Sequence, residues 1–191
     1  MEFVLEGESD SPFADLYVGE GLFQAPFGWV LLMRHLGETV LDERQKDTNL
    51  CCVNLSQLRR EILFLDEKHL AHCDIRAFNV VCHKSSHDET PILRLIDLDE
   101  CKSSPVDRAC AKVDGYAPYP VVKPNFAPCQ KNKLRRIRQW YTGYQLLSLM
   151  DFMGYTILQE YRTTMLAISN GQAVEAAAKG KLWSRALEQL E

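Results

Sequence analysis

The 191-residue sequence lacks the features that would place it in a membrane or in an oxidising compartment. It has no apolar run near the roughly 18 residues that a membrane-spanning helix needs. Residues 1–6 are acidic and lack the basic stretch that opens a secretory signal. Its seven cysteines form no C-x-x-C motif, which argues against a zinc ribbon or a thioredoxin-like site. We therefore expect a cytoplasmic protein, with the nucleus as an alternative, whose cysteines are reduced.

The sequence also lacks a strong excess of charge of either sign. With 22 Lys and Arg against 26 Asp and Glu, the net charge is -4, so broad nucleic-acid binding is not expected. A content of 46% hydrophobic and 25% charged residues is typical of a globular domain that can bury a core. A basic run at residues 131–138 is most simply a solvated helix face, although it could bind an acidic peptide or act as a localisation signal.

The N-terminal part of the chain predicts little regular structure. Residues 7–28 are rich in Gly, Ser, Pro and acidic side chains, which predicts a loop with at most a short strand at residues 16–18. The apolar run at residues 29–33 follows a glycine and predicts a buried strand. Residues 39–41 are expected to open a short helix.

The middle of the chain predicts one amphipathic helix followed by two strands. Asn54 is a plausible N-cap for a helix that ends near His69. Short strands are expected at residues 79–82 and 92–96, joined by a polar loop. The apolar residues of the helix fall on one face at a period of 3.6: Leu55, Leu58, Ile62, Leu63 and Leu65.

The C-terminal half predicts a long loop and then helices. Residues 102–131 are rich in proline, and a loop of this length is either functional, for example a substrate platform, or a mobile surface loop. Helical patterns follow at roughly 133–152, 155–168 and 173–190. The sequence as a whole therefore predicts an α+β fold that is mainly α.

Two short segments carry side chains suited to phosphoryl transfer. Residues 72–79 place His, Asp, Arg and Asn at the spacing H-x-D-x-R-x-x-N, directly after the predicted amphipathic helix. Residues 95–99 place an aspartate at the end of an apolar strand. One aspartate alone is usually a turn residue. The conjunction of both segments, each beside an apolar strand, favours a functional site over a solvated acidic turn.

Each polar residue of these segments has a chemical role in that interpretation. Asp74 could accept the proton of an attacking hydroxyl, and Arg76 could pair with the transferring phosphoryl group. Asn79 and Asp97 could bind Mg²⁺ through an amide oxygen and a carboxylate. His72 is expected to shape the loop through packing and hydrogen bonds rather than to react.

These residues resemble the C-terminal lobe of the protein-kinase-like superfamily over roughly residues 28–150. Residues 72–74 resemble its H-R-D motif, with Asn79 at the matching spacing, and residues 96–98 resemble the start of D-F-G. Residues 29–37 resemble the last small-lobe strand and the hinge, and residues 140–143 weakly resemble a W-S-x-G motif. The pattern is most similar to divergent fungal-type kinase-like proteins, and then to the aminoglycoside and choline phosphotransferase branch.

The resemblance implies a kinase-like C-lobe with a small β-hairpin and little or no N-lobe. Residues 1–28 would be an N-lobe remnant or linker, and residues 29–191 would be the lobe. It implies ATP and Mg²⁺ as cofactors, with Met33 and His35 at one wall of the adenine site. The substrate would carry a hydroxyl group, most simply on a protein.

The sequence departs from the family where the small lobe should be. No G-x-G-x-x-G motif precedes Trp29, Cys73 replaces the Arg of H-R-D, and Asp99 replaces the Gly of D-F-G. We therefore expect weak or absent ATP binding, and a partner that covers the face left by the missing lobe. Three functions stay open: a truncated, weakly active protein kinase, a pseudokinase-type binding or scaffold module, and a small-molecule phosphotransferase.

Overall fold

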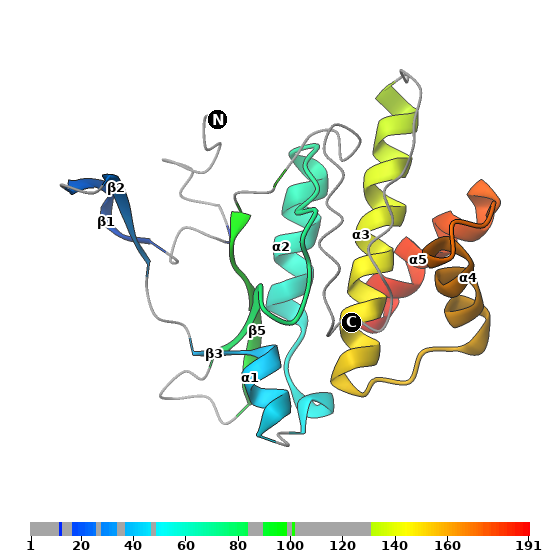
Figure 1. Cartoon of the computed structure of the whole chain (residues 1–191), viewed down its shortest axis with the longest axis horizontal. Helices are drawn as coiled ribbons and strands as arrows, with labels where there is room; N and C mark the ends of the chain where they lie inside the picture. Colours follow the sequence, from blue (N-terminus) through cyan, green and yellow to red (C-terminus); the bar gives the residue numbers. More distant parts are fainter. Residues whose placement is uncertain are drawn as a thin grey trace.

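A computed structural model of the chain describes a mainly helical α+β protein (Figure 1). Its described residues form a three-stranded antiparallel sheet, a separate two-stranded hairpin and three long helices after the sheet. The coarse fold class predicted from the sequence is therefore confirmed. The structure describes Pro12 and residues 17–25, 28–33, 37–46, 49–83, 90–98, 101 and 131–191.

The N-terminal hairpin consists of β1 (Tyr17–Ala25) and β2 (Gly28–Met33), which pair antiparallel. It lies at one side of the molecule, away from α3 to α5 (Figure 1). The strand predicted at residues 29–33 is confirmed, but the prediction of at most a short strand at residues 16–18 is wrong. Backbone pairing with β2 holds β1 extended despite its glycines, and the register is irregular where those glycines occur.

The second sheet has the order β3 (Glu38–Thr39), β4 (Val80–His83) and β5 (Ile92–Leu95). The predicted pair of strands is thus confirmed, and β3 adds a third. Gly37 enters β3 with a φ of 125°, and a Cβ atom there would lie 2.4 Å from the carbonyl oxygen of Cys82. Only glycine fits that close approach to β4.

The helices α1 and α2 precede the segment of residues 72–79 in the described part of the chain. The short helix α1 (Val40–Gln45) begins at a capping box between Thr39 and Asp42, as the sequence predicted a helix start here. After a single 3₁₀ turn (Leu50–Cys52), α2 spans Ser56–Glu67. Asn54 does accept a hydrogen bond from the amide of Ser56 at 2.9 Å, but the helix N-cap is one residue later than predicted. Of the predicted face, Leu55, Leu58, Ile62 and Leu65 are buried, and Leu63 is half-buried.

The C-terminal body contains α3 (Lys131–Met153), α4 (Gln159–Ser169) and α5 (Ala176–Gln189). All three predicted helices are confirmed, with ends shifted by a few residues. Residues 140–150 of α3 are buried without exception, so this helix is the centre of the core. In the basic run, Arg135 and Arg136 are exposed but Arg138 is buried, so that run is not simply a solvated face. The predicted long loop lies outside the described residues up to position 130.

A buried ion pair fixes β5 on α2. Arg94 Nε lies 2.5 Å from Glu61 Oε1, and the side chains are 4% and 0% exposed. The backbone amide of Leu95 donates to the other carboxylate oxygen at 2.7 Å. Burial raises the pKa of Glu61 to about 7, against the opposing effects of the Arg94 charge and of these hydrogen bonds.

None of the helices in the described ranges is long and apolar enough to cross a membrane.

The crossing of α3 and α5 gives a stability prediction at two glycines. A Cβ atom at Gly143 would lie 2.5 Å from the backbone nitrogen of Trp183, whereas one at Gly180 would meet nothing within 4 Å. Gly143→Ala should therefore lower the free energy of unfolding by about 1–3 kcal/mol, because two backbones must separate. Gly180→Ala, the matched control inside α5, should raise it by about 0.5–1 kcal/mol. Urea unfolding of both variants measures this, and equal effects would contradict the close crossing.

Candidate functional site

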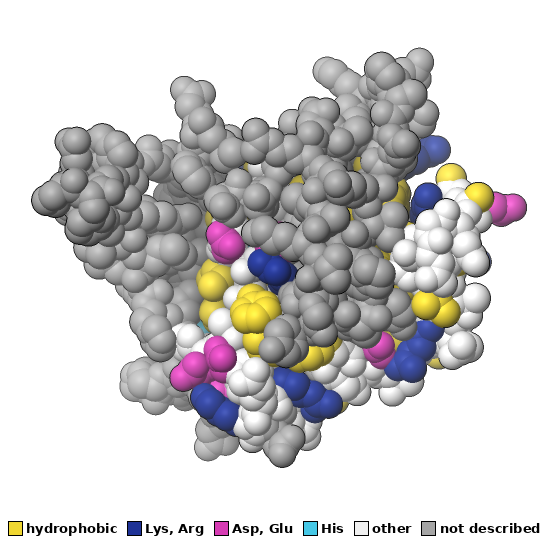
Figure 2. Space-filling view, viewed as in Figure 1, with side chains coloured by type: hydrophobic (Ala, Val, Ile, Leu, Met, Phe, Trp, Pro, Cys, Tyr) yellow, Lys and Arg dark blue, Asp and Glu magenta, His cyan; other side chains and the backbone are white. Residues whose placement is uncertain are grey.

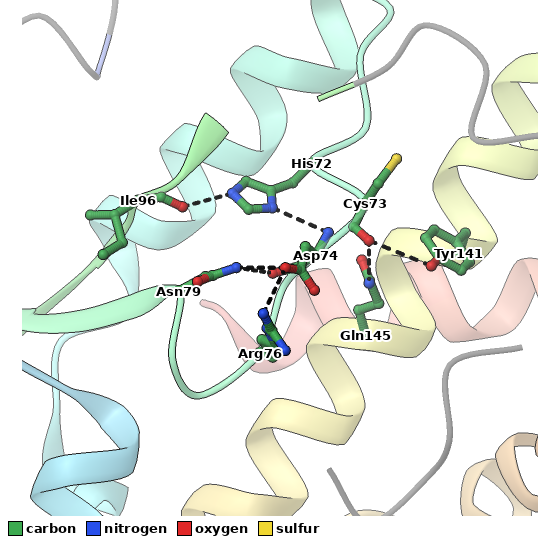
Figure 3. A network of polar contacts seen from close by, with 8 residues as sticks. All are labelled: His72, Cys73, Asp74, Arg76, Asn79, Ile96, Tyr141 and Gln145. Atoms are coloured by element: carbon green, nitrogen blue, oxygen red, sulfur yellow. Dashed lines mark hydrogen bonds and ion pairs between the residues drawn. The ribbon is translucent and has the colours of Figure 1, made fainter. Parts of the chain in front are cut away.

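A histidine joins the two segments that the sequence singled out (Figure 3). His72 is fully buried, and its Nε2 atom lies 2.9 Å from the carbonyl oxygen of Ile96. Its Nδ1 atom accepts a hydrogen bond from the amide of Asp74 at 3.3 Å. Since Nδ1 is the acceptor, Nε2 must carry the proton and donate to Ile96. The loop-shaping role expected for His72 is confirmed.

Three of the predicted site residues lie in direct contact. The Asn79 Nδ2 atom donates to Asp74 Oδ2 at 2.9 Å and to the Asp74 carbonyl at 3.0 Å. Arg76 Nη2 lies 3.2 Å from the same carboxylate oxygen of Asp74. Asp74 and Asn79 are buried and Arg76 is half-buried. The spacing H-x-D-x-R-x-x-N thus folds into one polar cluster beneath the surface.

Asp97 follows the residue that these contacts hold. The amide of Ile96 donates to the carbonyl of Asn79 at 3.0 Å, while its own carbonyl accepts from His72. Ile96 is therefore hydrogen-bonded through both its backbone N–H and its C=O, and Asp97 is the next residue in the chain. Asp97 is exposed and has a φ of 63°. The left-handed backbone is unusual for any residue but glycine, although aspartate and asparagine tolerate it better than most.

The predicted adenine wall is not tested. Met33 is the last residue of β2, and its side chain lies outside the described part of the structure. His35 also lies outside the described residues. Their assignment to a nucleotide site stays a prediction.

Two residues of α3 that sequence reasoning missed support the site loop. Gln145 Nε2 donates to the carbonyl of Cys73 at 3.0 Å, and the Tyr141 hydroxyl lies 3.5 Å from the same oxygen. Cys73 itself has a φ of 67°, so its carbonyl is turned toward the central helix (Figure 3). In the sequence, Tyr141 was considered only within residues 140–143, which weakly resemble a W-S-x-G motif. The signal for Gln145 was its polar amide within the stretch 140–150, which is fully buried, because a buried amide needs a hydrogen-bond partner.

The surface beside the cluster combines a cation with an aromatic ring. The guanidinium of Arg76 lies 5.6 Å from the ring centre of Phe78, which is 39% exposed. In the space-filling view, basic, acidic and hydrophobic side chains meet near the middle of the described surface (Figure 2). This arrangement can present a positive charge to an anionic group and an apolar contact beside it.

The oxygen donors present are compatible with Mg²⁺. Asn79 directs its amide nitrogen at Asp74, which leaves its amide oxygen on the opposite side of the group. The carboxylate of Asp97 would offer a second hard oxygen donor. Among the described residues there is no group of three or more His, Cys, Asp and Glu side chains that could hold a metal. Two protein oxygens suit Mg²⁺, which keeps waters and takes substrate phosphates, better than a metal that needs a full protein shell.

Comparison with known proteins does not identify the family. No protein-family model matches this chain, and no curated protein matches it significantly. The resemblance to the kinase C-lobe therefore rests on the two segments and on the order of helices and strands around them.

The double contact of His72 gives a second prediction. His72→Phe keeps the ring volume but leaves the amide of Asp74 and the carbonyl of Ile96 without this partner, and it should lower the free energy of unfolding by about 1–3 kcal/mol. In the parent protein, long-range ¹⁵N NMR should show Nε2 protonated and Nδ1 unprotonated. The control is His69→Asn, at an exposed position with a φ of 61° that asparagine tolerates. Equal stabilities of the two variants, or the opposite tautomer, would refute the contact.

Proposed function

We propose that this chain is a kinase-like phosphotransferase that moves the γ-phosphate of ATP to a hydroxyl group, most simply of a protein serine or threonine. The observation that supports this best is the contact between the two loops. Asn79 binds the Asp74 carboxylate through its side chain and Ile96 through its backbone. A candidate base and one candidate metal ligand are thereby in contact, and the second candidate ligand, Asp97, directly follows Ile96. This supports the proposal because positioning is most of what phosphoryl transfer asks of a protein.

The residues of the site have distinct roles in this proposal. Asp74 orients the acceptor hydroxyl and takes its proton, and the hydrogen bond from Asn79 fixes the direction of its carboxylate. Asn79 and Asp97 would hold Mg²⁺, which when bound neutralises charge on the phosphates. Gln145 and His72 keep the loop in shape from below.

Arg76 has a contact that its proposed role must accommodate. Its guanidinium pairs with Asp74, the candidate base, at 3.2 Å. To meet a phosphoryl group, it must share its donors between the carboxylate and the phosphate, which a planar guanidinium with five N–H groups can do. Its half-buried position beside Phe78 leaves it at the surface of the cluster.

The same contact favours a second candidate function, a binding or scaffold module without catalysis. One oxygen of Asp74, Oδ2, accepts from both Asn79 and Arg76. In a scaffold, these contacts would simply stabilise the loop. The small-molecule phosphotransferase alternative uses the same residues and differs only in the acceptor.

A ligand titration tests the proposed nucleotide site. ATP with Mg²⁺ at tenfold its Kd should raise the free energy of unfolding by about 1.4 kcal/mol, whereas ATP with EDTA should raise it less. Asp97→Asn removes the charge at a φ that asparagine tolerates, so it should abolish the Mg²⁺-dependent part without loss of fold. The control is Asp151→Asn, which alters an exposed ion pair with Arg162. Absence of any Mg²⁺-dependent shift in the parent chain would overturn the proposal.

Transfer is measured separately from binding. With labelled ATP and a mixture of serine- and threonine-containing proteins, Asp74→Asn should reduce phosphate transfer at least about 100-fold, because the base is lost. A Mg²⁺-dependent shift without transfer in the parent chain would support the scaffold alternative instead.

A further inference from the structure

The buried ion pair has a third partner from the far end of the chain. Arg94 Nη2 donates to the backbone carbonyl of Pro12 at 2.8 Å, and Gln57 Nε2 lies 3.4 Å from the same oxygen. Pro12 is buried. These contacts join positions 82 and 45 residues apart in sequence. We call the site formed by Gln57, Glu61 and Arg94 the Pro12 socket.

The chemistry of the socket matches a proline carbonyl. Proline has no N–H group, so its backbone offers only an acceptor. The groups that face the Pro12 oxygen are both donors, a guanidinium and an amide. The same two side chains also bind Glu61, with Gln57 Nε2 at 3.1 Å and Arg94 Nε at 2.5 Å. The Pro12 oxygen therefore completes a hydrogen-bond network around an ion pair that is almost wholly inaccessible.

The socket is connected to the strand that leads to Asp97. Arg94 is a residue of β5, and the amide of the next residue, Leu95, donates to Glu61. Removal of the Pro12 oxygen would take a partner from a buried cationic donor and admit water to the pair. Either effect loosens the contact between β5 and α2.

We propose that the Pro12 socket is a docking site for the N-terminal part of this chain, whose proline carbonyl completes the buried network and holds β5 against α2. Pro12 is then part of the folded unit and not of a separable linker. The inference does not depend on phosphotransferase activity, because it concerns only the packing of β5.

Two truncations test the docking. Removal of residues 1–16 deletes Pro12 and should raise the unfolding equilibrium constant about 5- to 30-fold. Amide hydrogen exchange in β5 should accelerate more than in α5, which packs mainly against α3. Removal of residues 1–8, the control, retains Pro12 and should leave both quantities unchanged. A peptide of residues 8–16, added at millimolar concentration, should restore slow amide exchange in β5 of the chain that lacks residues 1–16. A peptide of the same composition in shuffled order should not.

A second variant keeps the test decisive if the longer truncation does not fold. In the full chain, Arg94→Lys retains a cation for Glu61 but lacks the fork that also reaches Pro12. Chymotrypsin cleavage after Phe13, next to the docked residue, should then be about 5- to 30-fold faster than in the parent under native conditions. Equal cleavage rates, or truncations of equal stability, would overturn the docking of Pro12.

Discussion

The site depends on the backbone of one residue, Ile96, which is hydrogen-bonded through both its N–H and its C=O. Its amide donates to Asn79 and its carbonyl accepts from His72, across 17 to 24 residues of sequence. To bring such distant segments together costs chain entropy, which the buried contacts around them must offset. Because His72 also accepts from the amide of Asp74, the same ring fixes both loops. Without it, Asp97 would lose one of the contacts that fix its backbone relative to the Asp74 cluster, and the bond between Ile96 and Asn79 would remain.

Two neighbouring helices supply the rigidity that this contact needs. On one side, α2 holds β5 through the Glu61–Arg94 pair, and on the other, α3 holds the loop through Gln145. Between these supports, Cys73 and Asp97 both adopt left-handed backbone conformations, with φ of 67° and 63°. Such conformations cost about 1–2 kcal/mol each and persist only where the surroundings enforce them. Of the three non-glycine residues with left-handed backbone in the described ranges, two thus lie in the loops that carry the candidate catalytic and metal-binding residues, and the third, His69, lies just after α2.

Local pattern predicted those parts of the chain whose structure is decided locally. The apolar period of 3.6 located α2 and the three later helices, and the paired apolar runs located β4 and β5. The same reasoning failed for β1, because pairing with β2 is a tertiary effect that composition does not reveal. In the site, the spacing of Asp74, Arg76 and Asn79 predicted a cluster, and the structure brings them together. The sequence pattern did not predict the buried ion pair between Glu61 and Arg94. The two residues are 33 positions apart, and each interrupts an otherwise apolar pattern.

The site residues differ in burial, and this difference bears on which of them is informative about function. His72, Asp74 and Asn79 are buried in mutual hydrogen bonds, so a scaffold would gain stability from them as much as an enzyme would. Asp97 differs, since it is exposed and occupies a strained backbone conformation. Its carboxylate is accessible to a metal ion or a phosphate group, whereas that of Asp74 is buried and bound by Asn79 and Arg76. The charge of Asp97, more than the integrity of the Asp74 cluster, therefore distinguishes a metal-dependent phosphotransferase from a loop kept only for its structure.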